Sequence, residues 1–208
     1  EYMEMILFDE DHGIYEKEQP IGVQGHFITS PLVSRYFSHS IAKNFIEVSR
    51  QEKIRNIVEI GAGNGELAKD LVIFLKNNGS LPKKYYFLEK SLNLIEKQKK
   101  VIGNLNLDES IEFIWLTKFE NLPNEAFIIT NELFDCIPTD IIRYKDDLYQ
   151  KAYISDAFEI SWKEYDFFSE QSAKYLSLPE KLRDDYLFEF SPAQCEIIEN
   201  ISRFIHKA

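Results

Sequence analysis

Cysteine, histidine and long apolar runs are all scarce in this 208-residue chain, and each scarcity excludes a class of protein. The two cysteines, Cys136 and Cys195, stand far apart and match no metal-binding spacing, so we expect free thiols and a reducing compartment. The four histidines are scattered and none pairs with a cysteine at ligand spacing, so we predict no metal site. No apolar window approaches the length of a membrane span, which predicts a chain without a transmembrane helix.

Basic residues are outnumbered as well. The chain carries 24 Lys and Arg against 35 Asp and Glu, which gives a formal net charge of −11 and an isoelectric point of about 4.9. Contacts to phosphates require Lys and Arg, so a strongly acidic chain is a poor nucleic-acid binder. It suits a cationic substrate better, although net charge governs steering and solubility rather than the make-up of a site. We predict no nucleic-acid partner.

Length and composition favour one globular domain with an insertion. Hydrophobic residues make up 44% of the chain and aromatic residues 14%, which suffices for a sizeable core. The start Glu1-Tyr2-Met3 has neither the apolar core of a signal peptide nor the Arg- and Ser-rich character of a transit peptide. We therefore expect a cytoplasmic protein, or a mitochondrial matrix protein if the source is eukaryotic. The oligomeric state stays open.

Glycine is also uncommon, yet three of the eight glycines stand within the stretch Gly61–Gly65. The preceding residues, 57–60, predict a short strand buried on both faces, because they are apolar apart from Glu59. Glu59 interrupts the run at its carboxyl end, which is where open α/β sheets bind ligands. Glycines in such a turn permit positive φ angles and let a ligand approach the backbone, and they stand here at Gly61, Gly63 and Gly65.

The spacing of these glycines distinguishes two kinds of cofactor. A dinucleotide fingerprint is G-x-G-x-x-G, and its third glycine would fall at Glu66, where it is absent. The form found is G-x-G-x-G with an acidic residue two positions ahead. This form suits S-adenosylmethionine (SAM), which has an amino-acid tail and a sulfonium but no pyrophosphate to cradle. The alternative is that the turn is merely a tight connection between a strand and a helix.

A second acidic residue, Glu89, ends the next predicted strand, which begins at Tyr85. It lies roughly twenty-five residues beyond the glycine turn, close to where an acidic residue holds ribose hydroxyls in nucleotide-binding βαβ units. A carboxylate at this place can accept hydrogen bonds from a vicinal diol, and with the glycine turn beside it we favour ribose binding. The alternative is a solvated glutamate at a strand end.

Strands and helices alternate through the first two thirds of the chain. We predict an amphipathic helix over residues 32–52, capped by Ser30-Pro31, with one apolar face formed by Val33, Phe37, Ile41, Phe45 and Val48. A further helix is expected near residues 91–102, and further strands near 111–115 and 126–131. Alternating elements of this kind predict an α/β fold with a doubly wound, mostly parallel sheet.

The pattern changes after Pro138. Short strands near residues 141–144, 148–154 and 158–162 predict an antiparallel β-meander inserted on the carboxyl edge of the sheet. A helical stretch is expected near 169–177, then a strand at 186–190, and then a helix capped by Ser191-Pro192. A doubly wound sheet should continue beyond that helix, so we expect the domain to be incomplete at this C-terminus.

Five segments carry a further pattern. In chain order they are Glu1–Met5, Gly25–Pro31, Glu59–Gly65, Asn131–Pro138 and Glu189–Pro192. Together they resemble the signatures of the MidA-type methyltransferase family, the bacterial relatives of a mitochondrial complex I assembly factor. Gly25–Pro31 is similar to the family's G-D-F-I-T-S-P signature, and Asn131–Pro138 is similar to its N-E-F-F-D-A-[LI]-P signature. The resemblance covers nearly the whole chain; it departs at His26, where the family usually has aspartate.

The resemblance implies a Rossmann-like class I methyltransferase fold, with helices on both faces of the sheet. It implies one domain, residues 1–208. Its parts would be an N-terminal cap segment and helix (1–52), a SAM-binding core (53–137), the inserted meander (138–168) and a C-terminal part of the core (169–208). The cofactor-binding residues would be Glu59, Gly61, Gly63, Gly65 and Glu89, with Phe27 covering the adenosine and Thr29 bonding the methionyl tail.

The resemblance also implies an acceptor, because the mitochondrial members of the family are protein arginine methyltransferases. A guanidinium is planar, always charged and matched to a bidentate carboxylate. The expected catalytic residues are Asn131, Glu132 and Asp135 at the end of the fourth strand, although Asp135 could equally be the N-cap of a short turn. Alternatives left open are a non-catalytic assembly or scaffold protein, a nicotinamide-dependent oxidoreductase and a small-molecule methyltransferase.

Overall fold

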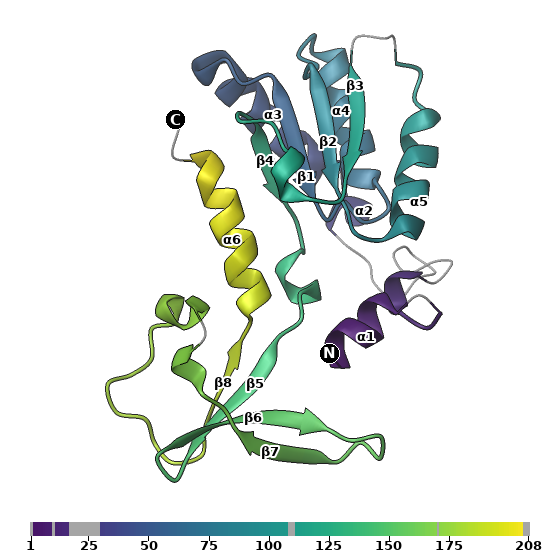
Figure 1. The fold of residues 1–208 in the computed structure, drawn as a ribbon. Coiled ribbons are helices and arrows are strands. Elements are labelled where there is room, and N and C mark those ends of the chain that lie inside the picture. The colour runs from purple at the N-terminus through teal and green to yellow at the C-terminus, as the bar shows by residue number, and fades with distance from the viewer. Residues whose placement is uncertain (1, 10, 17–29, 108–110, 170, 206–208) are drawn as a thin grey trace. The chain divides into compact units, whose positions relative to one another are not determined.

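The computed structural model describes residues 2–9, 11–16, 30–107, 111–169 and 171–205. The chain forms two compact units, one built mainly from Ile6–Asp135 and the other mainly from Cys136–Arg203 (Figure 1). The first unit is a mixed α/β structure around a parallel sheet, and the second is built around an antiparallel sheet. The predicted α/β fold class is confirmed.

The parallel sheet of the first unit has four strands in the order β3-β2-β1-β4. Their bounds are β1 Asn56–Ile60, β2 Lys84–Leu88, β3 Glu112–Leu116 and β4 Phe127–Thr130. The central strand β1 pairs on one side with β2 and on the other with β4, and Ile60 lies opposite both Leu88 and Thr130. The three strands therefore end at the same level, and the residues that follow them leave the sheet along one edge.

Helices α4 and α5 connect these strands (Figure 1). The chain opens with α1 Tyr2–Phe8, and the other helices of this unit are α2 Ser30–Val33, α3 Arg35–Glu52, α4 Glu66–Asn77 and α5 Leu92–Gly103. Helix α4 connects β1 to β2 and α5 connects β2 to β3, so both connections run in the same direction across the sheet. Because such connections are right-handed, both helices lie on the same face. Helix α4 supplies much of the core because Leu67, Leu71 and Leu75 recur at helical spacing and are buried.

The predicted helix over residues 32–52 is found as two helices, so its predicted start is wrong. Ser34 interrupts it in an extended conformation, and its side chain accepts a hydrogen bond from the Tyr36 backbone N–H at 3.2 Å, which makes Ser34 the N-cap of α3. The predicted apolar face is largely the one that packs, because Phe45 is buried and Phe37 and Ile41 pack against the core. Val33 is the exception and is exposed, while α3 also buries Ser38, Ala42 and Ser49.

The second unit holds an antiparallel sheet in the order β7-β6-β5-β8. Its strands are β5 Asp140–Lys145, β6 Leu148–Ile154, β7 Ile160–Glu164 and β8 Tyr186–Phe190. The predicted meander is thus present as a sheet of its own. The strand at 186–190 is also confirmed, but β8 pairs with β5 rather than with the parallel core that we expect from the sequence. A strand pattern shows that a segment is extended; it does not show which neighbour the segment pairs with.

Two details of this unit differ from the prediction. The third meander strand begins at Ile160 rather than 158, because a turn closed by the Ser155 N–H donating to the Glu159 carbonyl occupies the residues before it. The predicted helix at 169–177 is instead a pair of short 3₁₀ helices, Phe167–Ser169 and Gln171–Tyr175.

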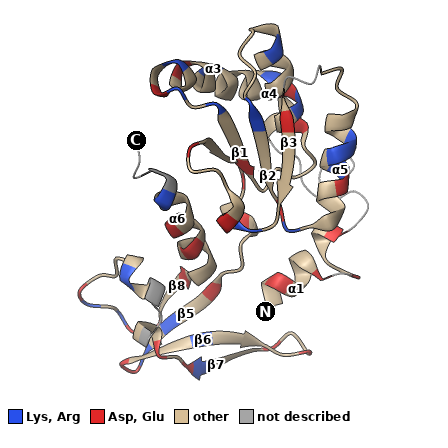
Figure 2. Ribbon diagram, turned by 45° about the horizontal axis from the view of Figure 1, so that its top comes forward, with Lys and Arg blue, Asp and Glu red and all other residues tan. Residues whose placement is uncertain are grey.

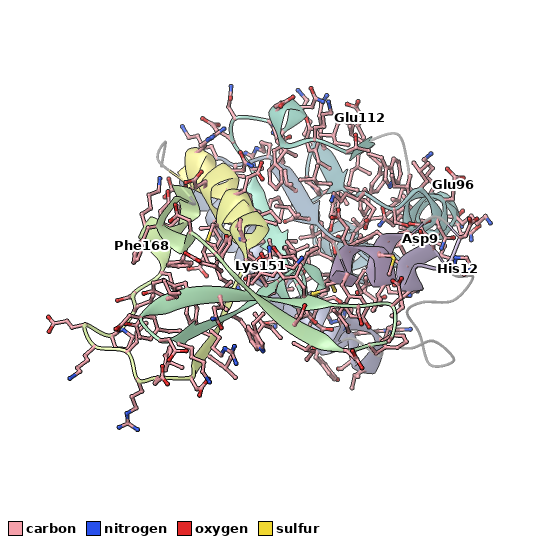
Figure 3. All side chains as sticks on the ribbon, turned by 60° about the horizontal axis from the view of Figure 1, so that its bottom comes forward. Asp9, His12, Glu96, Glu112, Lys151 and Phe168 are labelled. Carbon is pink, nitrogen blue, oxygen red and sulfur yellow. The ribbon has the colours of Figure 1, made fainter. Side chains whose placement is uncertain are left out.

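Aromatic rings form the core of the second unit. Phe167 is almost fully buried and lies with its ring centroid 5.0–5.5 Å from those of Tyr149, Phe188 and Phe190. The exposed ring of Phe168, labelled in Figure 3, lies edge-on to Tyr149. Edge-to-face contacts of this kind stabilise a core beyond the area that they bury.

Helix α6, Pro192–Ile205, follows β8 directly. The Ser191 side chain accepts a hydrogen bond from the Gln194 N–H at 3.1 Å and donates one to the Pro138 carbonyl at 2.7 Å. The predicted Ser191-Pro192 cap is therefore confirmed, and the same hydroxyl joins the start of α6 to the residues that precede β5.

Charged residues are spread over the surface of the first unit. Figure 2 shows acidic and basic residues interspersed along α3, α4 and α5. Within the described part of the chain, no helix combines the length and the hydropathy that a membrane crossing requires.

Burial along α4 predicts how two substitutions differ. Leu71 is fully buried and Ile73 is 40% exposed on the same helix. Leu71→Ala should lower the free energy of unfolding by about 2–5 kcal/mol, because it removes buried methyl groups and leaves a cavity. Ile73→Ala, the matched control, should cost less than about 1 kcal/mol. Urea denaturation measures both, and equal losses would contradict the packing described.

Candidate functional site

The carboxyl edge of the parallel sheet brings three segments together. The Gly61 N–H donates to the Leu88 carbonyl at 3.0 Å, and the Glu89 N–H donates to the Leu116 carbonyl at 3.0 Å. The backbone ladder thus continues one residue past β1 and β2. On the other side of β1, Leu133 lies so close that a Cβ on Gly61 would be 2.8 Å from its Cδ1 atom. The glycine turn, Glu89 and the segment after β4 are therefore neighbours.

The glycines of the turn all adopt positive φ angles, at 69° for Gly61, 56° for Gly63 and 85° for Gly65. Positions 61 and 65 are also crowded by the protein itself. A Cβ on Gly65 would lie 3.3 Å from the Cα atom of Gln98 in α5, and Gly61 has Leu133 against it. Packing inside the protein thus requires glycine at both positions, in addition to the access to the backbone that the sequence predicts.

Glu59 is buried in the sheet, with 2% of its surface exposed. The Tyr85 hydroxyl donates a hydrogen bond to its Oε2 atom at 2.5 Å, and Tyr85 is itself fully buried. Burial raises the pKa of Glu59 to about 8; the negative charge of Glu89 raises it as well, while the Tyr85 hydrogen bond lowers it. Burial and the adjacent Glu59 raise the pKa of Tyr85 far above its ordinary value, so Tyr85 stays a donor.

Glu89 is the second buried carboxylate, with 8% of its surface exposed. Its Oε1 atom accepts hydrogen bonds from the Lys90 and Ser91 N–H groups at 2.9 and 3.1 Å. Its Oε2 atom accepts one from the Gln98 side-chain amide at 3.2 Å. Burial raises the pKa of Glu89, and these three hydrogen bonds oppose the shift. The carboxylate is therefore held by both of its oxygens.

Two buried carboxylates at the ends of adjacent strands, beside a turn with positive φ angles, form a specific set of hydrogen-bond acceptors. Burying a charge without a partner is costly, so such a pair suits a ligand that brings positive charge and hydroxyl donors. SAM brings both, with its ammonium and sulfonium groups and its ribose diol. The residues present fit that cofactor.

Sequence reasoning missed Gln98, which joins the parts of this site. Gln98 is fully buried in α5, and its side chain contacts the glycine turn, Glu89 and the Trp115 side chain of β3. The sequence did hold a signal for it. Gln98 occupies the buried stripe of α5 between Leu94 and Ile102, where a polar residue is unusual unless its hydrogen bonds are made inside the protein.

The residues predicted to be catalytic follow β4. Asn131 comes directly after Thr130, the last residue of the strand, and Glu132 is exposed with a φ angle of 50°. The Ser30 N–H and hydroxyl both donate to Glu132 Oε1, at 3.1 and 3.2 Å, so this carboxylate ties the segment to the start of α2. Asp135 lies inside the 3₁₀ helix Phe134–Cys136 rather than before it, which does not match an N-cap role. The catalytic role of these residues stays a prediction.

Phe27, Thr29 and His26 fall outside the described residues. Cys136 and Cys195 are free thiols, as expected. No group of three or more His, Cys, Asp or Glu side chains in the described part of the chain is arranged to hold a metal ion.

The crowding at Gly61 predicts a difference between two glycines of similar φ. Gly79 has a φ angle of 60° and open space around its Cβ position. Gly79→Ala should cost about 1 kcal/mol of stability, the cost of a left-handed residue with a side chain. Gly61→Ala should cost clearly more, because its methyl group would meet Leu133. Urea denaturation measures both, and adding Leu133→Ala to Gly61→Ala should recover part of the extra loss; equal costs would contradict the packing.

The raised pKa of Glu59 predicts how stability depends on pH. Between the ordinary value of 4.5 and about 8, the folded protein keeps a proton on Glu59 that the unfolded chain has lost. The free energy of unfolding therefore falls as pH rises through this window, by at most about 1.4 kcal/mol for each step of one in pH. Glu59→Gln should remove this fall and raise the melting temperature at pH 8 but not at pH 4.5. If the stability of wild type and of Glu59→Gln changed in parallel with pH, the raised pKa of Glu59 would be contradicted. Glu112→Gln, at an exposed position, is the control and should keep the wild-type profile.

The comparisons with known proteins agree with this geometry. Residues 37–208 match the family model described as "Putative S-adenosyl-L-methionine-dependent methyltransferase". A crystal structure of a COG1565 superfamily member from Burkholderia thailandensis, bound to S-adenosyl-homocysteine, superposes with a TM-score of 0.77 at 23% identity. That match covers 96% of this chain and 53% of the other, and it shows the fold.

Curated relatives are similar over part of their length. The mitochondrial protein arginine methyltransferase NDUFAF7 of Bos taurus is 28% identical over 165 residues, which are 66% of this chain and 37% of the relative. Its Homo sapiens counterpart is 30% identical over 128 residues, which are 60% and 26%. The chain thus spans well under half the length of these relatives. The family model for SAM-dependent methyltransferases matches most of the chain, and the solved structure shares its fold. The chain therefore belongs to that methyltransferase family.

Proposed function

We propose that this protein transfers a methyl group from SAM to an arginine side chain of a partner protein. The observation that carries the proposal is the pair of buried carboxylates, Glu59 and Glu89, at the ends of adjacent strands beside the glycine turn. Such a pair suits a cationic ligand with hydroxyl donors, which a nicotinamide cofactor with its pyrophosphate matches less well. We place the protein in the cytoplasm, or in the mitochondrial matrix if the source is eukaryotic.

Each predicted cofactor-binding residue has a role in this proposal. Glu89 accepts a hydrogen bond from the ribose, and Glu59 in its ionised form balances positive charge. Gly61, Gly63 and Gly65 leave the backbone accessible, while Phe27 covers the adenosine and Thr29 bonds the methionyl tail. When bound, SAM supplies a methyl group already activated by its sulfonium. The protein then has chiefly to align the acceptor and exclude water, and such alignment can supply about 7–11 kcal/mol in favourable cases.

Asn131, Glu132 and Asp135 would align the acceptor. They follow β4, whose last residue pairs with Ile60, so they leave the sheet beside the glycine turn. A carboxylate here can hold a guanidinium through two parallel hydrogen bonds and direct one nitrogen towards the methyl group. The names of the relatives, which are protein arginine methyltransferases, support this choice of acceptor. The net charge of −11 also favours a cationic partner.

A second candidate function rests on the contact between Glu132 and Ser30. If that carboxylate serves only to hold the start of α2, the protein could bind SAM without methylating arginine and act in assembly instead. The two candidates differ in what Glu132→Gln does to turnover.

The first test is binding. Titration calorimetry with SAM and with NAD should give heat with SAM alone, because the glycine spacing and the carboxylate pair fit SAM better than NAD. Methyl-labelled SAM added with the protein to a lysate should then yield methylarginine, detected by mass spectrometry. Binding of NAD alone would overturn the cofactor assignment.

The second test is a matched pair of variants. Glu132→Gln should lower methyl transfer by about 100-fold or more while leaving SAM affinity within a few-fold, because the change removes charge from the acceptor side. Glu112→Gln removes a carboxylate at the amino end of β3, on the opposite edge of the sheet, and should leave transfer unchanged (Figure 3). Full transfer by Glu132→Gln would leave the assembly role as the better account.

A further inference from the structure

We infer that Gln98 is a positioning residue that holds Glu89 and the glycine turn in the arrangement that binds the ribose of SAM. The inference rests on the proposed function of this edge as the cofactor site. Gln98 itself lies in α5 and is fully buried, so it acts through the groups that it bonds rather than on the cofactor.

The side-chain amide of Gln98 has one possible orientation. The Trp115 Nε1–H group can only donate, and it lies 3.1 Å from Gln98 Oε1, so the amide oxygen must face it. The amide nitrogen then donates to the Gly63 carbonyl at 2.8 Å and to Glu89 Oε2 at 3.2 Å, both of which are acceptors. All polar atoms of this buried side chain are thus paired, which fixes its position.

Through this amide, Gln98 joins the ends of three strands. Gly63 follows β1, Glu89 follows β2 and Trp115 belongs to β3. The backbone of α5 also lies against the turn, because a Cβ on Gly65 would be 3.3 Å from the Gln98 Cα atom. A change at Gln98 should therefore affect the turn and the carboxylate together.

The neutral amide also fits the charges around it. Glu59 and Glu89 are already two carboxylates in a buried site, and the negative charge of Glu89 raises the pKa of Glu59. A third carboxylate at position 98 would add repulsion and would face a carbonyl oxygen that it cannot pair with. An apolar side chain would leave the Gly63 carbonyl and the Trp115 N–H without this partner and Glu89 Oε2 without its amide. Only an amide donor satisfies all three contacts.

The test compares ribose recognition in wild type and in Gln98→Met, which keeps the length of the side chain and removes its hydrogen bonds. Calorimetry measures the affinity for S-adenosyl-homocysteine and for its 2′-deoxy and 3′-deoxy analogues. In the wild type, loss of a hydroxyl held by Glu89 should weaken binding about tenfold or more. In Gln98→Met this penalty should shrink to about twofold, because Glu89 Oε2 loses its amide donor and the carboxylate is held through Oε1 alone. The exposed substitution Lys100→Met on the same helix should keep the wild-type penalty.

A purely structural role would give another pattern. If Gln98 only stabilises the fold, Gln98→Met should weaken binding of all three ligands by the same factor and keep the hydroxyl penalty, and that result would overturn the inference. Should Gln98→Met fail to fold, Trp115→Phe removes the donor that orients the amide and should also reduce the penalty; an unchanged penalty would count against the inference. Absence of binding by the wild type would overturn the proposed function itself, and with it this inference.

Discussion

Parallel pairing of β1 with β2 and β4 is the constraint on which the site depends. Ile60 lies opposite Leu88 and Thr130, so the chain leaves all three strands at one level. In a parallel sheet the carboxyl ends share an edge, and crossover helices return the chain to the opposite edge each time. That register alone brings together three groups that are far apart in the sequence: the glycine turn, Glu89 and the segment after β4.

The carboxylates at this edge make the site unfavourable for folding and favourable for a cationic ligand. Burial disfavours the charged form of both Glu59 and Glu89, and their mutual repulsion adds to the effect on Glu59. Tyr85, Gln98 and two backbone N–H groups offset part of this cost through hydrogen bonds. A bound ligand that carries positive charge would offset more of it.

Local sequence pattern was sufficient for the strands, the glycine turn and the placement of Glu59 and Glu89, because each depends on a short run of residues. It failed where the deciding contact lies far along the chain. Three such contacts join residues that are far apart in sequence: the pairing of β8 with β5, the bond between Ser30 and Glu132, and the contacts of Gln98. Ser34 was missed for another reason, since Ser30 and Ser34 are both candidate caps and the local pattern does not rank them.

A crystal structure of the protein with S-adenosyl-homocysteine is the most direct test of ribose binding by Glu89. We expect a ribose hydroxyl within hydrogen-bonding distance of the Glu89 carboxylate, with the nucleoside and its tail lying along Gly61–Gly65 and positive charge near Glu59. The Gln98 amide should keep its contacts to Gly63 and Glu89. A nucleoside bound away from Glu89, or a glycine turn that makes no contact with the ligand, would contradict the account.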